Sequence, residues 1–506
     1  MSDTAAHHDE DAARLAALGY TSEFKRDMSL WANFSLGFTY LSPVVGIYSL
    51  FGLLLPVAGP PMIWSLVIVG IGQFLVAQVF SEVVAQYPIA GGVYPWARRL
   101  WGRRWAWMAG WIYLAALLST IASVVYGAGP YLSFVLGVEP STAATIACAL
   151  GLIVFATFIN LAGTRVLALA AIAGFAAEIV GALAVGAWLL LTHREQTLSI
   201  FTDSFGAGAG SYVPAFLAAS LLGIYQYYGF EACGDVAEEV PNPGKRIPTS
   251  MRRTIYIGGA AAIFVTMALL LSISDFGAVI SGEDTDPVGT VLVDAFGETG
   301  TRVVFVVILL SFISCAMSLQ AAASRLTYSY ARDDMIFGSR ILKKFSQTRH
   351  VPPYAMLGAA LIPAAIVIGS QWMPGKALTL IISFGSLGIY VAFQMVVFAA
   401  LRARVKGWRP SGAFTLGSWG MPVTVAALVY GVSAIFVLVK YTAAAEGAWY
   451  ERYSLGVSAV VVIAVGLVYM LVSRPHERSD APHGDAIDAE LNPLEHQRRA
   501  RQIENL

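Results

Sequence analysis

The sequence has few charged residues. Asp, Glu, Lys and Arg make up 13% of its 506 residues, and hydrophobic residues make up 57%. About a quarter of a typical soluble protein is charged, so the composition excludes an ordinary soluble domain. Acidic and basic residues are equal in number, 32 of each. The zero net charge therefore indicates no particular partner, and we expect no binding to nucleic acid.

Cysteine and histidine are also scarce. Cys148, Cys233 and Cys315 all fall in apolar segments, where cysteine usually serves as a small buried side chain. Their spacing fits neither a disulfide nor a metal site. None of the seven histidines lies in an apolar segment, which argues against an active site inside a membrane that depends on histidine. We predict no cofactor, no metal site and no enzyme activity.

Long apolar segments, by contrast, recur along the chain. Each has about 20 residues, which is enough to cross a hydrocarbon core about 30 Å thick. The predicted spans are 31–55, 62–87, 106–135, 142–161, 166–191, 212–236, 255–274, 301–330, 354–371, 377–400, 421–439 and 455–472. The sequence thus predicts an all-α polytopic membrane protein with twelve transmembrane helices in the lipid bilayer.

Motifs of other membrane proteins are missing. The chain has no GxxxxGK[ST] motif for nucleotide phosphates. It also has no repeated selectivity-filter segment and no arginine-rich voltage-sensing helix. These absences argue against an ATP-driven pump and an ion channel, and they leave a secondary carrier as the main interpretation.

Basic residues are unevenly distributed between the predicted loops. If the N-terminus is cytoplasmic, all but five of the 32 lysines and arginines lie on the cytoplasmic side, as expected for a multi-pass protein. The first 30 residues show no cleavable signal, and the segment after Arg474 has the composition of disordered chain. We predict a protein of the cell (inner) membrane with both termini in the cytoplasm.

Two predicted spans contain helix-breaking residues near their middle. The first contains LSPVVGIYS, with Pro43 and Gly46, and the sixth contains YQYYGFEA, with Gly229. Proline removes a backbone donor and glycine weakens a helix, so both stretches can unwind. An ordinary kink without a ligand is the alternative for each break alone. Two breaks five spans apart fit a five-plus-five inverted repeat, in which carriers bind substrate near the midplane of the membrane.

This pattern predicts a division of the chain into two repeats and additional segments. The predicted parts are a cytoplasmic N-terminal tail (1–28), repeat 1 with helices 1–5 (29–192), repeat 2 with helices 6–10 (193–405), helices 11 and 12 (406–473) and a disordered cytoplasmic C-terminal tail (474–506).

The two breaks predict a site with two polar ends. Unwinding of the first span would free the amide N–H groups of residues 45–47 at the positive end of a half-helix, which suits a carboxylate. Unwinding of the sixth would free carbonyl groups near Tyr225 and Tyr228, which suit an ammonium group, and the ring of Tyr225 would add a cation–π contact. The candidate substrate-binding residues are Ser42, Val45, Gly46, Ile47, Tyr225, Tyr228 and Gly229.

Carboxylates follow the sixth break. Glu231, Asp235 and Glu239 recur every four residues, so a helix would place them on one face with Glu238 beside them. We expect Glu238 and Glu239 to pair with Lys245, with Arg246 or with arginines near Arg325.

Glu231 lies nearest the break, where an unpaired charge is costly. We predict that it is a gating or proton-sensing group, or the counter-ion of an amine. Asp235 and Glu178 are further gating or proton-sensing candidates, and Glu178 is the only ionisable residue in the interior of the fifth span.

Three serines in the eighth span suggest an alternative coupling ion. Ser311, Ser314 and Ser318 would be able to line a sodium site with the first span, but serine at helical spacing more often allows close helix packing. We therefore expect H⁺ rather than Na⁺ as the coupling ion.

Three stretches resemble the amino acid–polyamine–organocation superfamily of permeases. SEVVAQYPIAGGVYPWARRLWG (81–102) is similar to the family's P-x-A-G-G-x-Y-x-W loop after the second helix. GFEACGDVAEEVPNPGKRIP (229–248) is similar to its E-E-x-x-N-P-x-x-x-I-P pattern, and SRLTYSYARDDMI (324–336) to the end of its eighth helix. The resemblance extends over about residues 25–475.

The resemblance implies a five-plus-five core with discontinuous helices 1 and 6, followed by two further helices. Alternating access would occur by tilting of helices 1, 2, 6 and 7. The backbone of residues 45–47 would hold a substrate carboxylate, Tyr225 would be the aromatic lid, and Glu231 would occupy a gating position.

The sequence departs from the family at two positions. Where the family commonly has G-S-G-I-F, this chain has VVGIY at 44–48, and the valines crowd the backbone. This leaves room for another amino compound, such as 4-aminobutyrate, ethanolamine, choline or a polyamine. Several proton-coupled relatives carry a lysine on the fifth helix, where this chain has Glu178, so the coupling mechanism cannot simply be inherited.

The sequence therefore predicts a secondary active transporter for an amino acid or a closely related amino compound, linked to protons. The alternatives are an amine or polyamine carrier or exchanger and, from another class, a nutrient-sensing or structural membrane subunit that does not transport. The sequence gives no indication of the oligomeric state.

Overall fold

The computed structural model of the chain describes residues 2–21, 23–139, 141–208, 210–372, 377–442 and 449–486. The helices before the sixth predicted span are α1 (Ser2–Ala17), α2 (Leu30–Leu41), α3 (Pro43–Ala58), α4 (Trp64–Gln86), α5 (Val93–Leu100), α6 (Arg103–Gly127), α7 (Gly129–Leu136), α8 (Thr142–Leu161) and α9 (Thr164–Thr192).

The later α-helices are α10 (Tyr212–Ala219), α11 (Leu221–Gln226), α12 (Ala232–Asp235), α13 (Pro243–Leu271), α14 (Phe276–Ser281), α15 (Pro287–Arg332), α16 (Ser339–Leu342), α17 (Pro353–Gly369), α18 (Ala377–Val405), α19 (Gly420–Tyr441), α20 (Trp449–Arg452), α21 (Ser454–Ser473) and α22 (Pro475–Arg478). Short 3₁₀ helices are η1 (Pro60–Ile63), η2 (Leu198–Thr202), η3 (Ala237–Glu239), η4 (Ser370–Trp372) and η5 (Gly417–Trp419).

Eleven helical segments within the described residues are long and apolar enough to cross a membrane. They correspond to every predicted span except the sixth. In the sixth, the apolar helical segment Tyr212–Gln226 is shorter, and a non-helical stretch separates it from the short helix α12. The prediction of an all-α, multi-pass membrane protein is confirmed.

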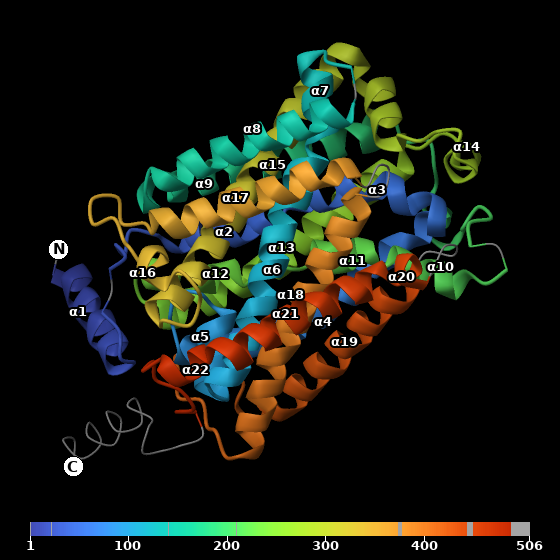
Figure 1. Cartoon of the computed structure of the whole chain (residues 1–506). Coiled ribbons are helices and arrows are strands. Elements are labelled where there is room, and N and C mark those ends of the chain that lie inside the picture. The colour runs from blue at the N-terminus through green and yellow to red at the C-terminus, as the bar shows by residue number, and fades with distance from the viewer. Residues whose placement is uncertain are drawn as a thin grey trace.

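The long helices run alongside one another. Figure 1 shows α8 and α9 along one side of the bundle and α19 and α21 along the opposite side. Between them, α2 packs against α9, α13 and α15, and α6 packs along α18. The interrupted first span is therefore enclosed by other helices, which shields its backbone from lipid.

Both terminal segments contact α5, and Figure 1 shows α1 and α22 at the same end of the bundle. The guanidinium group of Arg99 donates to the carbonyl of Leu18 from the N-terminal segment and pairs with Asp485 from the C-terminal segment. The described N-terminal and C-terminal segments thus lie at one end of the bundle, as the prediction of two cytoplasmic termini requires.

The structure differs from the prediction of a disordered tail at the beginning of that segment. Arg99 and Asp485 are both buried and lie 2.7 Å apart, and the amide of Gly484 donates to the carbonyl of Arg98 at 3.0 Å. Arg103 adds two hydrogen bonds to the Ala481 carbonyl. These contacts come from a distant part of the chain, which composition does not reveal. The remaining residues of the predicted tail, 487–506, lie outside the described residues.

Candidate functional site

The first predicted break is present. Helix α2 ends at Leu41 and α3 begins at Pro43, and Ser42 between them has φ 39° and ψ 94°. The Ser42 amide closes α2 by donating to the Phe38 carbonyl at 2.7 Å. Because the proline of the next helix has no N–H, the break needs fewer partners than usual.

The amide groups at the start of α3 are occupied, in contrast to the prediction. The Val45 amide donates to the Ser42 hydroxyl at 3.0 Å, and the Gly46 amide donates to the Ser42 carbonyl at 3.1 Å. Ile47 lies one residue further along, where the helix supplies its own acceptor. In this conformation the expected free N–H groups of residues 45–47 are therefore already paired, since Ser42 caps α3.

Glu178 on α9 occupies the anion position at this helix start. Its Oε1 atom accepts hydrogen bonds from the Ser42 hydroxyl at 2.5 Å and from the Val44 amide at 3.1 Å. A carboxylate suits the positive end of a helix, so the contact stabilises α3. The side chain is fully buried, and its Oε2 atom has no partner within the described part of the chain.

The second predicted break is also present. Helix α11 ends at Gln226 and α12 begins at Ala232, and Gly229 between them has φ 110°, which favours glycine. The carbonyl groups of residues 224–227 have no acceptor role within the helix, as at any helix C-terminus. This confirms the unwinding that was predicted near Tyr225.

The two breaks contact each other directly. A Cβ atom on Gly229 would lie 2.6 Å from the amide nitrogen of Leu41, and Gln226 donates to the Leu41 carbonyl at 3.2 Å. The rings of Tyr40 and Tyr228 pack edge to face, with centroids 6.1 Å apart. We call the region formed by residues 40–46 and 226–231 the break junction.

Aromatic side chains cover this junction. The Tyr225 hydroxyl lies 3.3 Å from the Ser123 hydroxyl of α6, and the Tyr225 and Tyr228 rings pack edge to face at 5.5 Å. Both tyrosines are buried. The structure thus places the two predicted tyrosines beside the break, where their rings pack against each other and, for Tyr228, against Tyr40.

Glu231 and Asp235 share one hydroxyl group. The hydroxyl oxygen of Tyr113 on α6 lies 3.1 Å from Oε1 of Glu231 and 3.1 Å from Oδ2 of Asp235. The Gly229 amide donates to Oε2 of Glu231 at 2.7 Å. A phenol has one hydrogen, so it donates to one carboxylate at a time. The second contact is a hydrogen bond only when one of the two carboxyl groups is protonated.

Two glycines of the loop before α5 make room for Asp235. The Gly91 amide donates to the Asp235 carbonyl at 3.0 Å, and a Cβ atom on Gly92 would collide with Oδ1 of Asp235. That Oδ1 atom has no hydrogen-bond partner in the described ranges. The glycine pair of the second-helix loop therefore packs directly against the end of the sixth span.

The predicted pairing of Glu238 and Glu239 with arginines is confirmed. Arg332 donates to both oxygens of Glu238 at 3.0–3.1 Å, and Arg325 donates to Glu239 at 2.8 Å. These ion pairs connect the end of the sixth span to α15 and have no substrate-binding geometry.

The serines of the eighth span form hydrogen bonds with other groups of the chain. Ser311 and Ser314 donate to carbonyl groups four residues earlier in α15. The Ser318 hydroxyl lies 2.8 Å from the Thr39 hydroxyl of α2. The Ser318–Thr39 contact joins α15 to α2, as expected for close helix packing.

The sequence did not identify Tyr113, Gln226 or Tyr40 as site residues. Each lies within an apolar span, and a polar group among apolar residues was the only feature of the sequence that pointed to it. Their roles depend on which helices become neighbours, which no spacing within one span reveals.

Comparison with known proteins gives a family and a fold. Residues 28–465 match the family model described as amino acid permease. The chain is 25% identical over 500 residues to the amino-acid permease BAT1 of Arabidopsis thaliana, covering 92% of this chain and 95% of the relative. It is 23% identical to a putative polyamine transporter of Candida albicans, covering 82% and 78%.

A solved structure of a manganese transporter from Eremococcus coleocola shares the fold. Its TM-score is 0.59 with 12% sequence identity, over 89% of this chain and 94% of that structure. The similarity shows a shared fold and nothing about the substrate.

Proposed function

The chain belongs to the amino acid permease family, and on that premise we propose that it is a secondary active transporter. It moves an amino acid or a closely related amino compound across the cell (inner) membrane by alternating access, linked to protons. Its inverted repeats are residues 29–192 and 193–405, followed by two helices in 406–473, and both termini face the cytoplasm.

The break junction is the observation that most supports this proposal. Two spans far apart in sequence are interrupted at positions that contact each other, at Leu41 and Gly229. The backbone of both breaks, two tyrosine rings and the carboxyl group of Glu231 meet there. Interrupted helices of this kind provide polar groups for a substrate without exposing backbone to lipid.

Proton linkage follows from the two buried acid sites. In the first, Glu231 and Asp235 compete for the single hydrogen of Tyr113, so the pair gains a hydrogen bond when it binds one proton. In the second, Glu178 holds Ser42 and the Val44 amide at the start of α3. Protonation of Glu178 would weaken its attraction to the helix and allow α3 to move.

A carrier of amines or polyamines is the second candidate. Glu178 already occupies the anion position that a substrate carboxylate would take at the start of α3. An amine without a carboxylate needs no such position, and Glu231 would serve as its counter-ion. The Candida albicans relative named as a putative polyamine transporter supports the same substrate class.

A binding panel followed by uptake tests both candidates. Purified protein is screened by thermal shift at two pH values with α-amino acids, ω-amino acids, simple amines and polyamines. Stabilisation only by compounds with both a carboxylate and an amine supports the amino acid carrier, and stabilisation by amines alone supports the second candidate. Stabilising compounds are then tested for uptake into proteoliposomes with an imposed pH gradient.

The variant Glu231→Gln separates the two roles of this carboxyl group. A counter-ion predicts loss of binding at every pH, whereas a proton switch predicts retained binding with altered pH dependence of uptake. Glu195→Gln, an exposed loop residue, is the matched control and should change neither. A ligand that binds but never crosses the membrane would instead indicate a nutrient sensor or structural subunit.

A further inference from the structure

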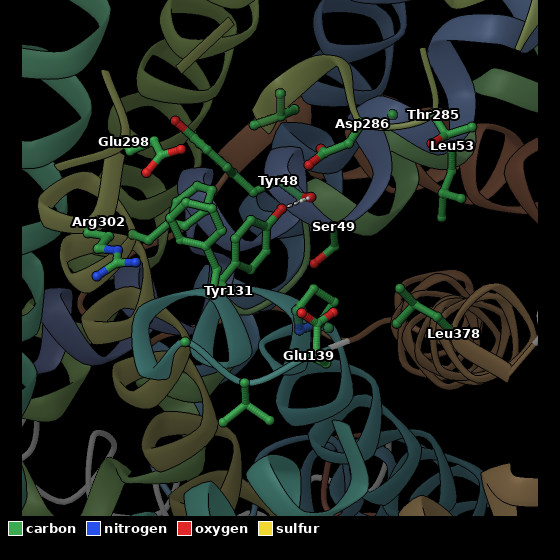
Figure 2. Close-up of a pocket in the computed structure, with 18 residues that line it drawn as sticks. Tyr48, Ser49, Leu53, Tyr131, Glu139, Thr285, Asp286, Glu298, Arg302 and Leu378 are labelled. Carbon is green, nitrogen blue, oxygen red and sulfur yellow. Dashed lines mark hydrogen bonds between the residues drawn. The ribbon is translucent and has the colours of Figure 1, made fainter. Parts of the chain in front are cut away.

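A cavity of about 650 Å³ lies at the end of the bundle away from the chain termini. Figure 2 shows the residues that line it, among them Tyr48 and Ser49 of α3 and Tyr131 of α7. Tyr48 and Ser49 follow the break junction by less than one helical turn, so the cavity lies just beyond it along α3. We call this cavity the aromatic pocket.

Aromatic rings form the wall of this pocket. The Tyr131 hydroxyl donates to the Tyr48 carbonyl at 2.7 Å, and the two rings pack edge to face at 6.3 Å. Phe305 of α15 packs edge to face against Tyr131 at 5.1 Å and against Phe134 at 5.0 Å. Tyr48, Tyr131, Phe134 and Phe305 thus form a connected set fixed by mutual contacts.

Carboxyl groups outnumber cations at the pocket. The Asp, Glu, Lys and Arg side chains among its described lining residues are Glu139, Asp286, Glu298 and Arg302, three acids to one base. The Arg302 guanidinium lies 6.0 Å from the centre of the Phe134 ring, which is one wall of the pocket. A cation is therefore a demonstrated neighbour of these rings, and the remaining charge is negative.

A buried hydroxyl group provides an independent sign of a ligand. Ser49 is 7% exposed, and its Oγ atom has no hydrogen-bond partner within the described part of the chain. In Figure 2 its hydroxyl points into the space between Tyr131, Glu139 and Leu378. Buried polar atoms are nearly always paired, so the unpaired Ser49 hydroxyl beside the cavity is a candidate partner for a polar group of a ligand.

We propose that the aromatic pocket is a binding site for organic ammonium compounds, separate from the break junction. The ring faces attract the cation, the excess carboxylates balance its charge, and Ser49 accepts a hydrogen bond from an N–H group. The volume lies within the range of small-molecule sites, about 300–1,000 Å³. A carboxylate without an amine would be repelled by the acidic rim.

The proposal for the aromatic pocket rests on the proposed function only for the class of ligand, an amino compound. Binding in the pocket does not require transport. The first test is calorimetric titration of the full chain in nanodiscs with tetraethylammonium chloride. Saturable binding is expected, and the double variant Glu139→Gln/Glu298→Gln should raise the Kd roughly tenfold, since two nearby carboxylates are removed. The matched control Glu195→Gln/Glu283→Gln removes two acids outside the pocket and should leave the Kd unchanged.

The second test uses Ser49→Ala. Ethylammonium can donate a hydrogen bond to Ser49, whereas tetraethylammonium has no N–H group. The variant should raise the Kd of ethylammonium by about threefold to tenfold and leave that of tetraethylammonium unchanged. Absence of saturable tetraethylammonium binding, or equal Kd values in the two double variants, would overturn the proposal.

The variant Glu231→Gln distinguishes this site from the break junction. It should alter uptake of the transported compound and leave tetraethylammonium binding unchanged. Absence of uptake in the unaltered protein, with the predicted binding pattern intact, would refute the proposed function and keep the pocket. Uptake without saturable tetraethylammonium binding would refute the pocket and keep the proposed function. Loss of tetraethylammonium binding in Glu231→Gln would show that the pocket is not a separate site.

Discussion

Glu178 and Ser42 together complete the hydrogen bonding at the start of α3. Glu178 accepts from the Ser42 hydroxyl and the Val44 amide, and Ser42 accepts from the Val45 amide. All four residues are buried. An internal carboxylate therefore occupies the helix start at which a substrate carboxylate was expected.

Glu178→Ala is expected to destabilise the protein by about 1–3 kcal/mol, because the buried Val44 amide loses its acceptor. The thermal unfolding midpoint in detergent measures the effect. Glu195→Ala, on an exposed loop, is the control and should change stability by no more than about 0.5 kcal/mol. Equal midpoints for the two variants would show that the Glu178 contact does not hold α3.

Gly229 lies directly against the first break, so there is no room for a side chain at this position. Gly229→Ala would bring a Cβ atom within 2.6 Å of the Leu41 amide nitrogen, in addition to the strain of φ 110°. The expected result is a lower unfolding midpoint and loss of substrate binding.

Gly282→Ala is the matched control for Gly229→Ala. Gly282 also has a positive φ, 81°, but a Cβ atom there meets nothing within 4 Å among the described residues. Its cost is the backbone strain alone, about 1–2 kcal/mol. If both variants lowered the midpoint equally, the contact between the two breaks would not be close.

At the scale of elements, buried ion pairs fix the end of the sixth span. Glu239 of η3 pairs with Arg325 of α15, and both side chains are almost fully buried. Glu238 pairs with Arg332 in the same way. These pairs hold the chain after the break to α15, so the break can unwind while its far end remains in place.

Arg325→Met is expected to cost about 3–5 kcal/mol, because it leaves the Glu239 carboxylate buried without its partner. The measurement is again thermal unfolding. Lys343→Met removes the exposed pair with Asp334, whose side chains are 40% and 53% exposed, and should cost no more than about 1 kcal/mol. Adding Glu239→Gln to Arg325→Met should recover part of the loss; no recovery would contradict the ion-pair explanation.

At the scale of the whole molecule, α5 connects the two chain ends. Arg99 contacts Leu18 and Asp485, and the amides of Gly484 and Ala486 donate to the carbonyls of Arg98 and Arg99. The N-terminal and C-terminal segments are thus attached to α5, which directly follows the loop that contacts Asp235. Movement at this end of the bundle has to displace them.

Asp485→Ala should release the C-terminal segment from α5, because Arg99 loses its carboxylate partner. Faster hydrogen exchange at the Gly484 and Ala486 amides is the expected result, measured by mass spectrometry. Asp480→Ala, an exposed neighbour in the same segment, is the control. Unchanged exchange in Asp485→Ala would mean that other contacts hold the segment.

Features that depend on neighbouring residues in the sequence were predictable. The length of each apolar segment gave the spans, and Pro43 and Gly229 gave the two breaks. The hydrogen-bond partners of Glu178 and of Asp235 were not predictable, because they lie on helices more than 100 residues away in the sequence. The prediction that residues 45–47 have free amides was wrong for this conformation, because Ser42 caps α3 and accepts from the amides of Val45 and Gly46.

Counterflow is the most direct test of a carrier with an alternately exposed site. Proteoliposomes are loaded with an unlabelled amino compound that stabilises the protein, and the labelled compound is added outside at low concentration. The account predicts a transient accumulation of label above its equilibrium level, and its absence in Gly229→Ala. Label that only rises slowly to equilibrium, or does not enter, would contradict alternating access at the break junction.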